Sequence, residues 1–141
     1  MTGIDVRRID EAGVATLRKV DDDIFDEAID PAHFATYLAQ PQNLLIVALD
    51  GDLVIGQCQA VMHTHPDQPP TLYLDNLGVA PSHRRRGIAR RLVTEMMAWG
   101  RERGCAEAWV ATEPDNVEAR ALYASLKGEP VEDVVYYAYK L

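Results

Sequence analysis

The sequence predicts a mixed α/β domain, in which a central mixed β-sheet is flanked by helices. Apolar runs of strand length lie on both sides of an Asp-Gly turn signal at residues 50–51, which is typical of a hairpin. An amphipathic pattern, from about residue 86 to Gly104, then separates apolar runs at residues 72–79 and 107–112. A strand–helix–strand order implies a right-handed crossover and parallel neighbours in one sheet.

The N-terminal part of the chain supplies further elements. Residues 4–9 predict a first strand, and Asp10 can cap a helix that runs to about residue 19. Pro31 suits a first helical position, so a short helix is expected before Pro41. These elements add one strand to the predicted sheet and two helices beside it.

The C-terminal part predicts one more helix and one more strand. Asp115 or Asn116 can cap a helix that ends at Leu126, before Gly128. Aromatic residues alternate along residues 134–141, which predicts a last strand. That strand could form the edge of a homodimer or lie inside the monomer.

Length and composition indicate one domain over residues 1–141, because 48% of the residues are hydrophobic and no linker-like stretch divides the chain. The apolar run at residues 44–49 is too short to span a bilayer, and the N-terminus lacks an apolar leader. Cys58 and Cys105 have no metal-ligand spacing, so reduced thiols are expected. We expect a cytoplasmic protein without a membrane partner.

The charge balance excludes nucleic acid as the expected partner. The net charge is −8, from 22 acidic and 14 basic residues, whereas nucleic-acid binding requires a broad basic surface. Basic residues gather at residues 84–91, and acidic residues gather at residues 21–30 and 113–133. This separation suits one anionic and one cationic ligand held at different places. Solubility alone could also account for the acidic clusters.

Two histidines lie close together in the sequence and could suggest a metal site. His63 and His65 lie in a proline-rich stretch, residues 63–70, but they have no companion ligand cluster. We therefore interpret this stretch as an exposed turn and expect no metal.

The basic loop after the strand at residues 72–79 predicts a pyrophosphate site. Backbone N–H groups at a helix start lack intrahelical partners and favour anions. Gly87 permits close approach of a ligand, although a solvated basic face is the alternative. Five arginines add charge and bidentate donors, namely Arg84, Arg85, Arg86, Arg90 and Arg91.

Two motifs resemble those of one enzyme family. The pattern R-x-x-G-x-A at residues 84–89 resembles the Q/R-x-x-G-x-G/A signature of the GCN5-related N-acetyltransferases (GNAT). The pattern N-x-x-A-x-x-L-Y-x-x-x-x-G at residues 116–128 resembles the second signature, N-x-x-A-x-x-L-Y-x-x-x-G-F, with one extra residue before the glycine and no phenylalanine after it. The resemblance implies the acetyltransferase fold, with splayed strands at an acetyl-CoA site.

The resemblance also implies roles for individual residues. The strand end at residues 77–79 would pair with the pantetheine arm of acetyl-CoA, and the basic loop would hold the pyrophosphate. Asn116 would contact pantetheine, and Tyr123 would point at the thioester sulfur, although Tyr123 could instead be a core aromatic residue. The residues implied in acetyl-CoA binding are Leu77, Gly78, Val79, Arg84, Arg85, Arg86, Gly87, Ile88, Ala89, Arg90, Asn116, Ala119 and Tyr123.

The chemistry of acetyl transfer requires an acid and a base. A thiolate with a pKa near 8.5 leaves, and a phenol with a pKa near 10, such as Tyr123, can protonate it or donate a hydrogen bond to it. Glu113 is the first candidate for the base or for a water-positioning group, and Asp75 and Asp115 are alternatives. No cysteine or serine lies in an evident nucleophile motif, so direct transfer is expected.

Within the family, the closer resemblance is to the aminoglycoside 3-N-acetyltransferases of the gentamicin type. It rests on Y-L-D-N-L-G-V at residues 73–79, G-I-A at 87–89, A-L-Y at 121–123, V-E-D-V-V at 131–135 and the acidic segment at 21–30. In those enzymes a polycationic aminoglycoside lies in an acidic cleft, and they usually carry aspartate where this chain has Asn76. The implied substrate contacts are Asp26, Glu27, Asp75, Asn76, Glu113, Asp115, Glu132 and Asp133.

The predicted function is therefore acetyl-CoA-dependent N-acetylation of an aminoglycoside, at the 3-amino group. One alternative is acetylation of another cationic amine, such as a polyamine, a peptide N-terminus or a lysine. Another alternative is a non-catalytic module that binds acyl-CoA.

Overall fold

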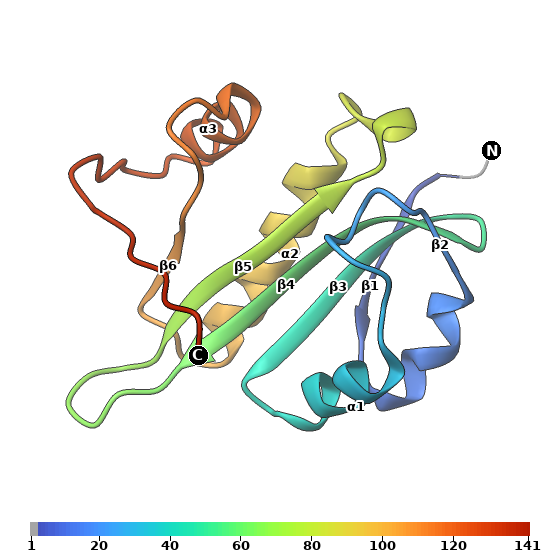
Figure 1. Ribbon diagram of the computed structural model, residues 1–141, viewed down its shortest axis with the longest axis horizontal. Helices are drawn as coiled ribbons and strands as arrows, with labels where there is room; N and C mark the ends of the chain where they lie inside the picture. Colours follow the sequence, from blue (N-terminus) through green and yellow to red (C-terminus); the bar gives the residue numbers. More distant parts are fainter. Residues whose placement is uncertain (1–2) are drawn as a thin grey trace. The chain divides into compact units, whose positions relative to one another are not determined.

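The computed structural model describes residues 3–141 and divides them into two compact units, the first ending at Ala111 and the second beginning at Thr112 (Figure 1). In the described part of the chain, no helix has the length and apolar character that crossing a bilayer requires.

The first unit is built on one mixed sheet, with the strand order β1-β3-β4-β5-β6 and with β2 pairing in parallel with β4. Neighbouring strands from β1 to β5 are antiparallel, and β5 and β6 are parallel, as the strand–helix–strand pattern predicted. The strands are β1 Asp5–Ile9, β2 Lys19–Val20, β3 Asn43–Asp50, β4 Leu53–His63, β5 Thr71–Val79 and β6 Glu107–Val110.

Helix α2 covers one face of this sheet (Figure 1). It spans Ile88–Glu102, and its apolar stripe is buried, as expected from the spacing of Ile88, Leu92 and Met96. An added Cβ at Gly56 of β4 would lie 3.2 Å from Leu92 Cδ1, so the even-numbered residues of this part of β4 face α2. The 3-10 helix η1, Glu11–Arg18, contacts β1 and β4. Helix α1, Pro31–Ala39, contacts β3 and lies at the bottom of Figure 1.

Capping and turn residues confirm the sequence-based boundaries. The Asp10 carboxylate accepts a hydrogen bond from Gly13 N at 3.0 Å, and Asp30 accepts two at the start of α1. Gly51, with φ 62°, turns the hairpin, and Gly104, with φ 82°, follows the end of α2. The positive φ explains glycine at both turns.

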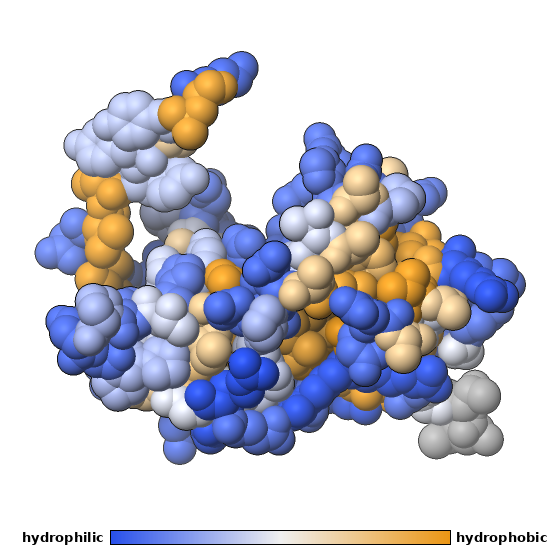
Figure 2. Space-filling view, turned by 90° about the horizontal axis from the view of Figure 1, so that it is seen from below, coloured by the Kyte–Doolittle hydropathy of each residue, from blue (hydrophilic) through white to orange (hydrophobic). Residues whose placement is uncertain are grey.

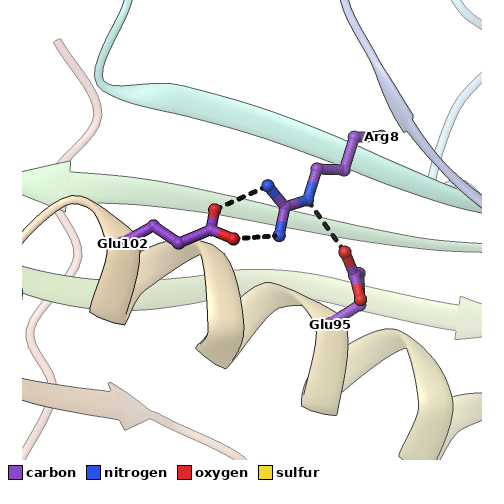
Figure 3. Close-up of polar contacts among 3 residues, drawn as sticks. All are labelled: Arg8, Glu95 and Glu102. Atoms are coloured by element: carbon purple, nitrogen blue, oxygen red, sulfur yellow. Dashed lines mark hydrogen bonds and ion pairs between the residues drawn. The ribbon is translucent and has the colours of Figure 1, made fainter.

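An ion-pair cluster fixes α2 to the edge strand β1 (Figure 3). Arg8 Nε donates to Glu95 at 2.9 Å, and its two terminal nitrogens donate to the two Glu102 oxygens at 2.7 and 3.2 Å. These bonds raise the pKa of the Arg8 guanidinium and lower the pKa of the Glu102 carboxyl. The cluster joins residues that are far apart in the sequence, so it supports the tertiary arrangement of the first unit.

The second unit contains helix α3, Val117–Ser125, capped by Asn116 as predicted. Arg120 of α3 donates to Pro114 O at 2.9 Å and forms an ion pair with Glu132. The helix ends at Ser125 and Leu126 is its C-cap. Lys127 then has a positive φ of 65°, and Gly128 N donates to Tyr123 O at 2.9 Å.

The strand predicted at residues 134–141 is wrong for this structure. These residues adopt no strand conformation, because alternating apolar side chains form a strand only where a neighbouring strand completes the hydrogen bonds. Figure 2 shows apolar residues at the molecular surface, and several of the most exposed large ones belong to this segment. They are Val134, Val135, Tyr136, Tyr137, Tyr139 and Leu141.

Candidate functional site

Strand β5 is paired on both sides only in its first half. Its ladder with β6 ends at the pair Leu74 and Val110, whereas its ladder with β4 continues to Val79. Among the described residues, no strand pairs with the other edge of residues 75–79. An edge of this kind can pair with the amide groups of an extended ligand, as an added strand does.

A bulge lies where the sheet opens. Gln59 of β4 pairs with Asn76, and Ala60 pairs with Leu74, so Asp75 is an extra residue in β5. A bulge of this kind bends the strand and turns a side chain out of the ladder, and Asp75 is exposed. The bulge therefore coincides with the last β6 pair and separates the two halves of β5.

The basic loop follows the open half of β5. It contains the short 3-10 helix η2, Pro81–His83, and Arg85 and Gly87 both have positive φ, of 64° and 73°. Gly87 is the N-cap of α2 and supplies no side-chain cap, so the first N–H groups of α2 are not capped by its own N-cap residue. Ile88 is buried and Ala89 is half-buried, so these two residues anchor the helix start.

The arginines of this loop differ in their surroundings. Arg84, Arg85 and Arg86 are exposed before the start of α2. Arg91 Nη1 donates to Ile4 O at 2.9 Å, so this arginine holds the N-terminal segment. The exposed arginines, together with Gly87 and the helix start, fit a pyrophosphate group.

The acidic segment at residues 21–30, here called the strap, lies against β4 and β5. Asp21 N donates to Val54 O at 2.9 Å, and Ile24 is buried. An added Cβ at Gly78 would lie only 2.2 Å from Ile24 O. Gly78 was expected to pair with pantetheine, and the structure gives this position an additional reason for glycine, which is close packing of the strap.

Polar side chains connect the strap to the open half of β5. Gln57 Nε2 donates to Ile24 O at 2.8 Å and to Asn76 Oδ1 at 2.6 Å, and Asn76 Nδ2 donates to Asp26 at 3.1 Å. The structure thus brings together Asp26 and Asn76, two of the predicted acceptor-binding residues. Glu27, beside Asp26, is exposed. Gln57 was missed by the sequence analysis, although the sequence Q-C-Q at residues 57–59 places two amides in an otherwise apolar strand.

The other predicted residues belong to the second unit. Asn116 Oδ1 accepts a hydrogen bond from Ala119 N at 3.0 Å, so the Asn116 side chain caps α3. Tyr123 is half-buried on the same helix. Glu113 and Asp115 precede α3 and are exposed, as are Glu132, paired with Arg120, and Asp133. Their predicted roles in cofactor binding and catalysis stay predictions.

The surroundings of both cysteines disfavour the thiolate. Burial raises the pKa of the Cys58 thiol to about 12, and partial burial also raises the pKa of Cys105. A thiol is nucleophilic as the thiolate, so a covalent acetyl-cysteine intermediate is disfavoured. His63 stacks on Tyr73, and His65 contacts Thr71 Oγ1 at 3.1 Å. Among residues 3–141, no cluster of three or more His, Cys, Asp or Glu side chains could hold a metal.

Comparison with known proteins decides the family. The model of the acetyltransferase (GNAT) family matches residues 13–128, which is most of the chain. The chain belongs to the GNAT family. It is an acetyltransferase that uses acetyl-CoA, and its fold is the mixed α/β fold that the two motifs implied.

Several characterised GNAT proteins are similar to this chain. Aminoglycoside N(6′)-acetyltransferase type 1 of Salmonella typhimurium is 27% identical over 115 residues, which cover 79% of this chain and 74% of that protein. N-alpha-acetyltransferase RimI of Mycobacterium tuberculosis is 32% identical over 102 residues, which cover 72% of this chain and 61% of that protein. The structure of AAC(6′)-Iy with the bisubstrate analogue CoA-S-monomethyl-acetylneamine superposes with a TM-score of 0.81, at 25% identity, over 99% of this chain and 100% of that chain.

These relatives correct one expectation about this GNAT protein. The closer resemblance was expected to the aminoglycoside 3-N-acetyltransferases, but the two aminoglycoside enzymes described above are named for the 6′ position. The motifs at residues 84–89 and 116–128 are shared by the whole family, so they carry no information on which amine is acetylated.

Proposed function

We propose that this acetyltransferase transfers the acetyl group of acetyl-CoA to an aminoglycoside, at the 6′-amino group. The observation that carries the proposal is the position of the acidic strap against the open half of β5. Asp26 contacts Asn76, which belongs to the strand stretch that offers its free edge to the cofactor arm. A polycationic acceptor held by the strap would thus lie next to the thioester.

The first unit supplies the proposed acetyl-CoA site. The backbone of residues 77–79 pairs with the pantetheine amides, and the exposed arginines at residues 84–86, Arg90 and the N–H groups after Gly87 hold the pyrophosphate. Such a site fits the observed geometry, because no strand among residues 3–141 pairs with that edge of β5 and α2 begins without a cap from the side chain of its N-cap residue.

The proposed reaction is a direct transfer. The neutral acceptor amine attacks the thioester carbonyl carbon, a C–N bond forms, and the C–S bond breaks with its electron pair on sulfur. Tyr123 donates a hydrogen bond or proton to the leaving sulfur, and Glu113 accepts the amine proton directly or through water, with Asp75 and Asp115 as alternatives. Asn116 contacts pantetheine through atoms that its capping role leaves available. Positioning of amine and thioester supplies most of the acceleration.

The proposed partners follow from the charge pattern. The acceptor is a polycationic small molecule that the acidic residues attract, and the proposal includes neither nucleic acid nor a membrane. We also propose a cytoplasmic location. The exposed apolar segment at residues 134–141 supports a possible homodimer, in which a second copy would cover these side chains.

The test is free-thiol release from acetyl-CoA with sisomicin, gentamicin, kanamycin, spermidine and a short peptide as acceptors, followed by mapping of the acetylated nitrogen. We expect release with the aminoglycosides and acetylation at the 6′ nitrogen of kanamycin. Acetylation at the 3-amino group would contradict the proposed 6′ position. No thiol release with any aminoglycoside would overturn the proposed substrate class.

A second candidate acceptor is a peptide N-terminus. The similarity to N-alpha-acetyltransferase RimI favours it, because that relative covers a comparable part of this chain. The same panel separates the two candidates, since a peptide that is acetylated faster than every aminoglycoside at equal concentration would support the peptide acceptor.

A further inference from the structure

A chain of side-chain amides runs through the first unit and ends on the strap. Gln59 Nε2 donates to Gln57 Oε1 at 3.2 Å. Gln57 Nε2 donates to Ile24 O and to Asn76 Oδ1, and Asn76 Nδ2 donates to Asp26 Oδ2. Gln57 and Asn76 thus link a buried strand to an exposed carboxylate.

The acceptors at the two ends of this hydrogen-bond network fix the orientation of its amide groups. The Ile24 carbonyl and the ionised Asp26 carboxylate are acceptors only, so Gln57 must turn its NH₂ group to Ile24, and Asn76 must turn its NH₂ group to Asp26. Asn76 then presents its oxygen to Gln57, which has the second donor to satisfy it. Neither amide can be reversed without placing two donors or two acceptors against each other.

The backbone register explains why these residues meet. Gln57 of β4 pairs with Gly78 of β5, and Gln59 pairs with Asn76. Gly56 faces α2, so its neighbour Gln57 points to the opposite face, which the strap crosses. Gly78 leaves room for the Ile24 carbonyl, and Gln57, which is 0% exposed, donates the hydrogen bond that this buried carbonyl requires.

We propose that Gln57 and Asn76 are positioning residues, which hold the Asp26 carboxylate ready for an ammonium group of the acceptor. This inference rests on the proposed function. Asp26 is exposed, and its Oδ2 accepts the hydrogen bond from Asn76, so Oδ1 is the oxygen that we expect to contact the ligand. A carboxylate held in place before binding loses less conformational freedom when the acceptor arrives, and this strengthens binding.

The hydrogen-bond network also explains why position 76 is an asparagine. An aspartate there would present acceptors to both Gln57 and Asp26, so it would place a second negative charge against the Asp26 carboxylate. Asn76 has the donor that Asp26 requires and the acceptor that Gln57 requires. A neutral amide at this position therefore fits the strap, and the charge that contacts the acceptor belongs to Asp26.

The experiment compares D26N, N76A, Q57L and the double variant Q57L/D26N with the unchanged protein, using sisomicin as the acceptor. For D26N we expect the KM for sisomicin to rise about tenfold, and for N76A and Q57L about three- to fivefold. The KM for acetyl-CoA should stay within about twofold. The double variant should resemble D26N alone, because Gln57 acts through Asp26.

A matched control removes part-buried hydrogen bonds elsewhere in the first unit. Tyr37 Oη donates to Leu44 O at 2.7 Å and contacts Ala60 O at 3.1 Å, and neither partner belongs to the strap. Y37F should lower the thermal stability but leave both KM values unchanged. N76A keeps the test decisive if Q57L does not fold, because it cuts the link to Asp26 and leaves the buried Gln57–Ile24 bond in place.

The outcomes separate this inference from the proposed function. Wild-type protein that acetylates no aminoglycoside overturns the proposed function and this inference with it. Wild-type activity with an unchanged sisomicin KM in D26N or N76A overturns the inference alone. A rise in the sisomicin KM of Q57L/D26N equal to the product of the two single effects would show that Gln57 does not act through Asp26.

Discussion

The two acidic regions of this acetyltransferase are similar in the sequence and different in the structure. The strap is fixed to β4 and β5 by a buried isoleucine and by hydrogen bonds from Gln57 and Asn76. In the second unit Glu132 is paired with Arg120, and Glu113, Asp115 and Asp133 are exposed. Negative charge alone therefore does not identify a binding residue. A carboxylate is suited to bind a cation when its surroundings hold it in place and leave one face open.

The two units also differ in the roles that we expect of them. The first unit contains the edge of β5 with which no described strand pairs, the basic loop and the strap, and we propose that these features bind the pyrophosphate, part of the pantetheine arm and the acceptor. The second unit contains Tyr123 and Glu113, to which the family resemblance assigns the chemistry. Variants in each unit can test this division.

Removing the Tyr123 hydroxyl tests the chemical role of the second unit. Y123F should lower kcat by about 100-fold, because the leaving thiolate loses its acid, with little change in the KM for acetyl-CoA. Steady-state thiol release measures both constants. Y136F is the control, since Tyr136 is 87% exposed in the same unit and should leave kcat unchanged. An unchanged kcat in Y123F would remove Tyr123 from the mechanism.

Crowding the strap tests its attachment. In G78A the new Cβ would lie 2.2 Å from Ile24 O, and two backbones must then separate, so we expect a loss of about 3 kcal/mol of unfolding free energy and a higher acceptor KM. In G100A the new Cβ would lie 2.9 Å from Leu72 Cδ2. A side-chain end can move, so this control should change stability by about 1 kcal/mol or less. Urea unfolding measures both, and equal losses would contradict the close packing of the strap.

Neutralising each acidic region tests the comparison directly. D26N/E27Q should lower kcat/KM for the acceptor by about tenfold, whereas E132Q/D133N should lower it by about twofold or less. Each double variant removes two charges, so a general effect of net charge would be the same in both. A larger effect of the pair in the second unit would reverse the assignment.

Asp30, the last residue of the strap, should make the folding stability depend on pH. N–H groups of His33 and Ala32 donate to Asp30, and these bonds lower the pKa of its carboxyl. Because the pKa is lower in the folded state, this contribution to stability is present above the ordinary value near 3.9 and is lost as the pH falls through the lowered value. D30N should keep the cap without titrating.

We therefore expect the Tm advantage of the wild type over D30N to shrink between pH 6 and pH 3. Thermal melts at several pH values measure it. An advantage that is constant over this range would show that the charge of Asp30 does not contribute.

Much of the fold was predictable from local signals. Asp10 and Asn116 were identified as possible caps, and each accepts a backbone hydrogen bond at the start of its helix. Pro31 was expected at a first helical position, and α1 begins there. The Asp-Gly turn and the spacing of the α2 stripe were also informative, since they depend on residues within a few positions of each other. The prediction failed at residues 134–141, because strand formation there depends on a partner that the local pattern cannot supply.

The candidate site was predictable only in part. The motif at residues 84–89 located the basic loop, because its glycine and arginines follow each other directly. The sequence did not indicate which amine of the acceptor is acetylated, since the family motifs do not encode it. The similarity to an enzyme named for the 6′ position changed the expected position from 3 to 6′. Gln57 was not predicted, because the role of a glutamine in an apolar strand depends on which residues lie next to it in the folded protein.

The sequence by itself determined the class of fold, the family and the location of the basic loop, because capping, turn and motif signals are local. The tertiary structure decided where β5 loses its second partner, why Gly78 must be glycine and which carboxylate is held. Each of these features joins residues that are distant in the chain, such as Ile24 with Gly78 and Asp26 with Asn76. Such contacts depend on strand register and on the path of the strap, and only the packed sheet fixes both.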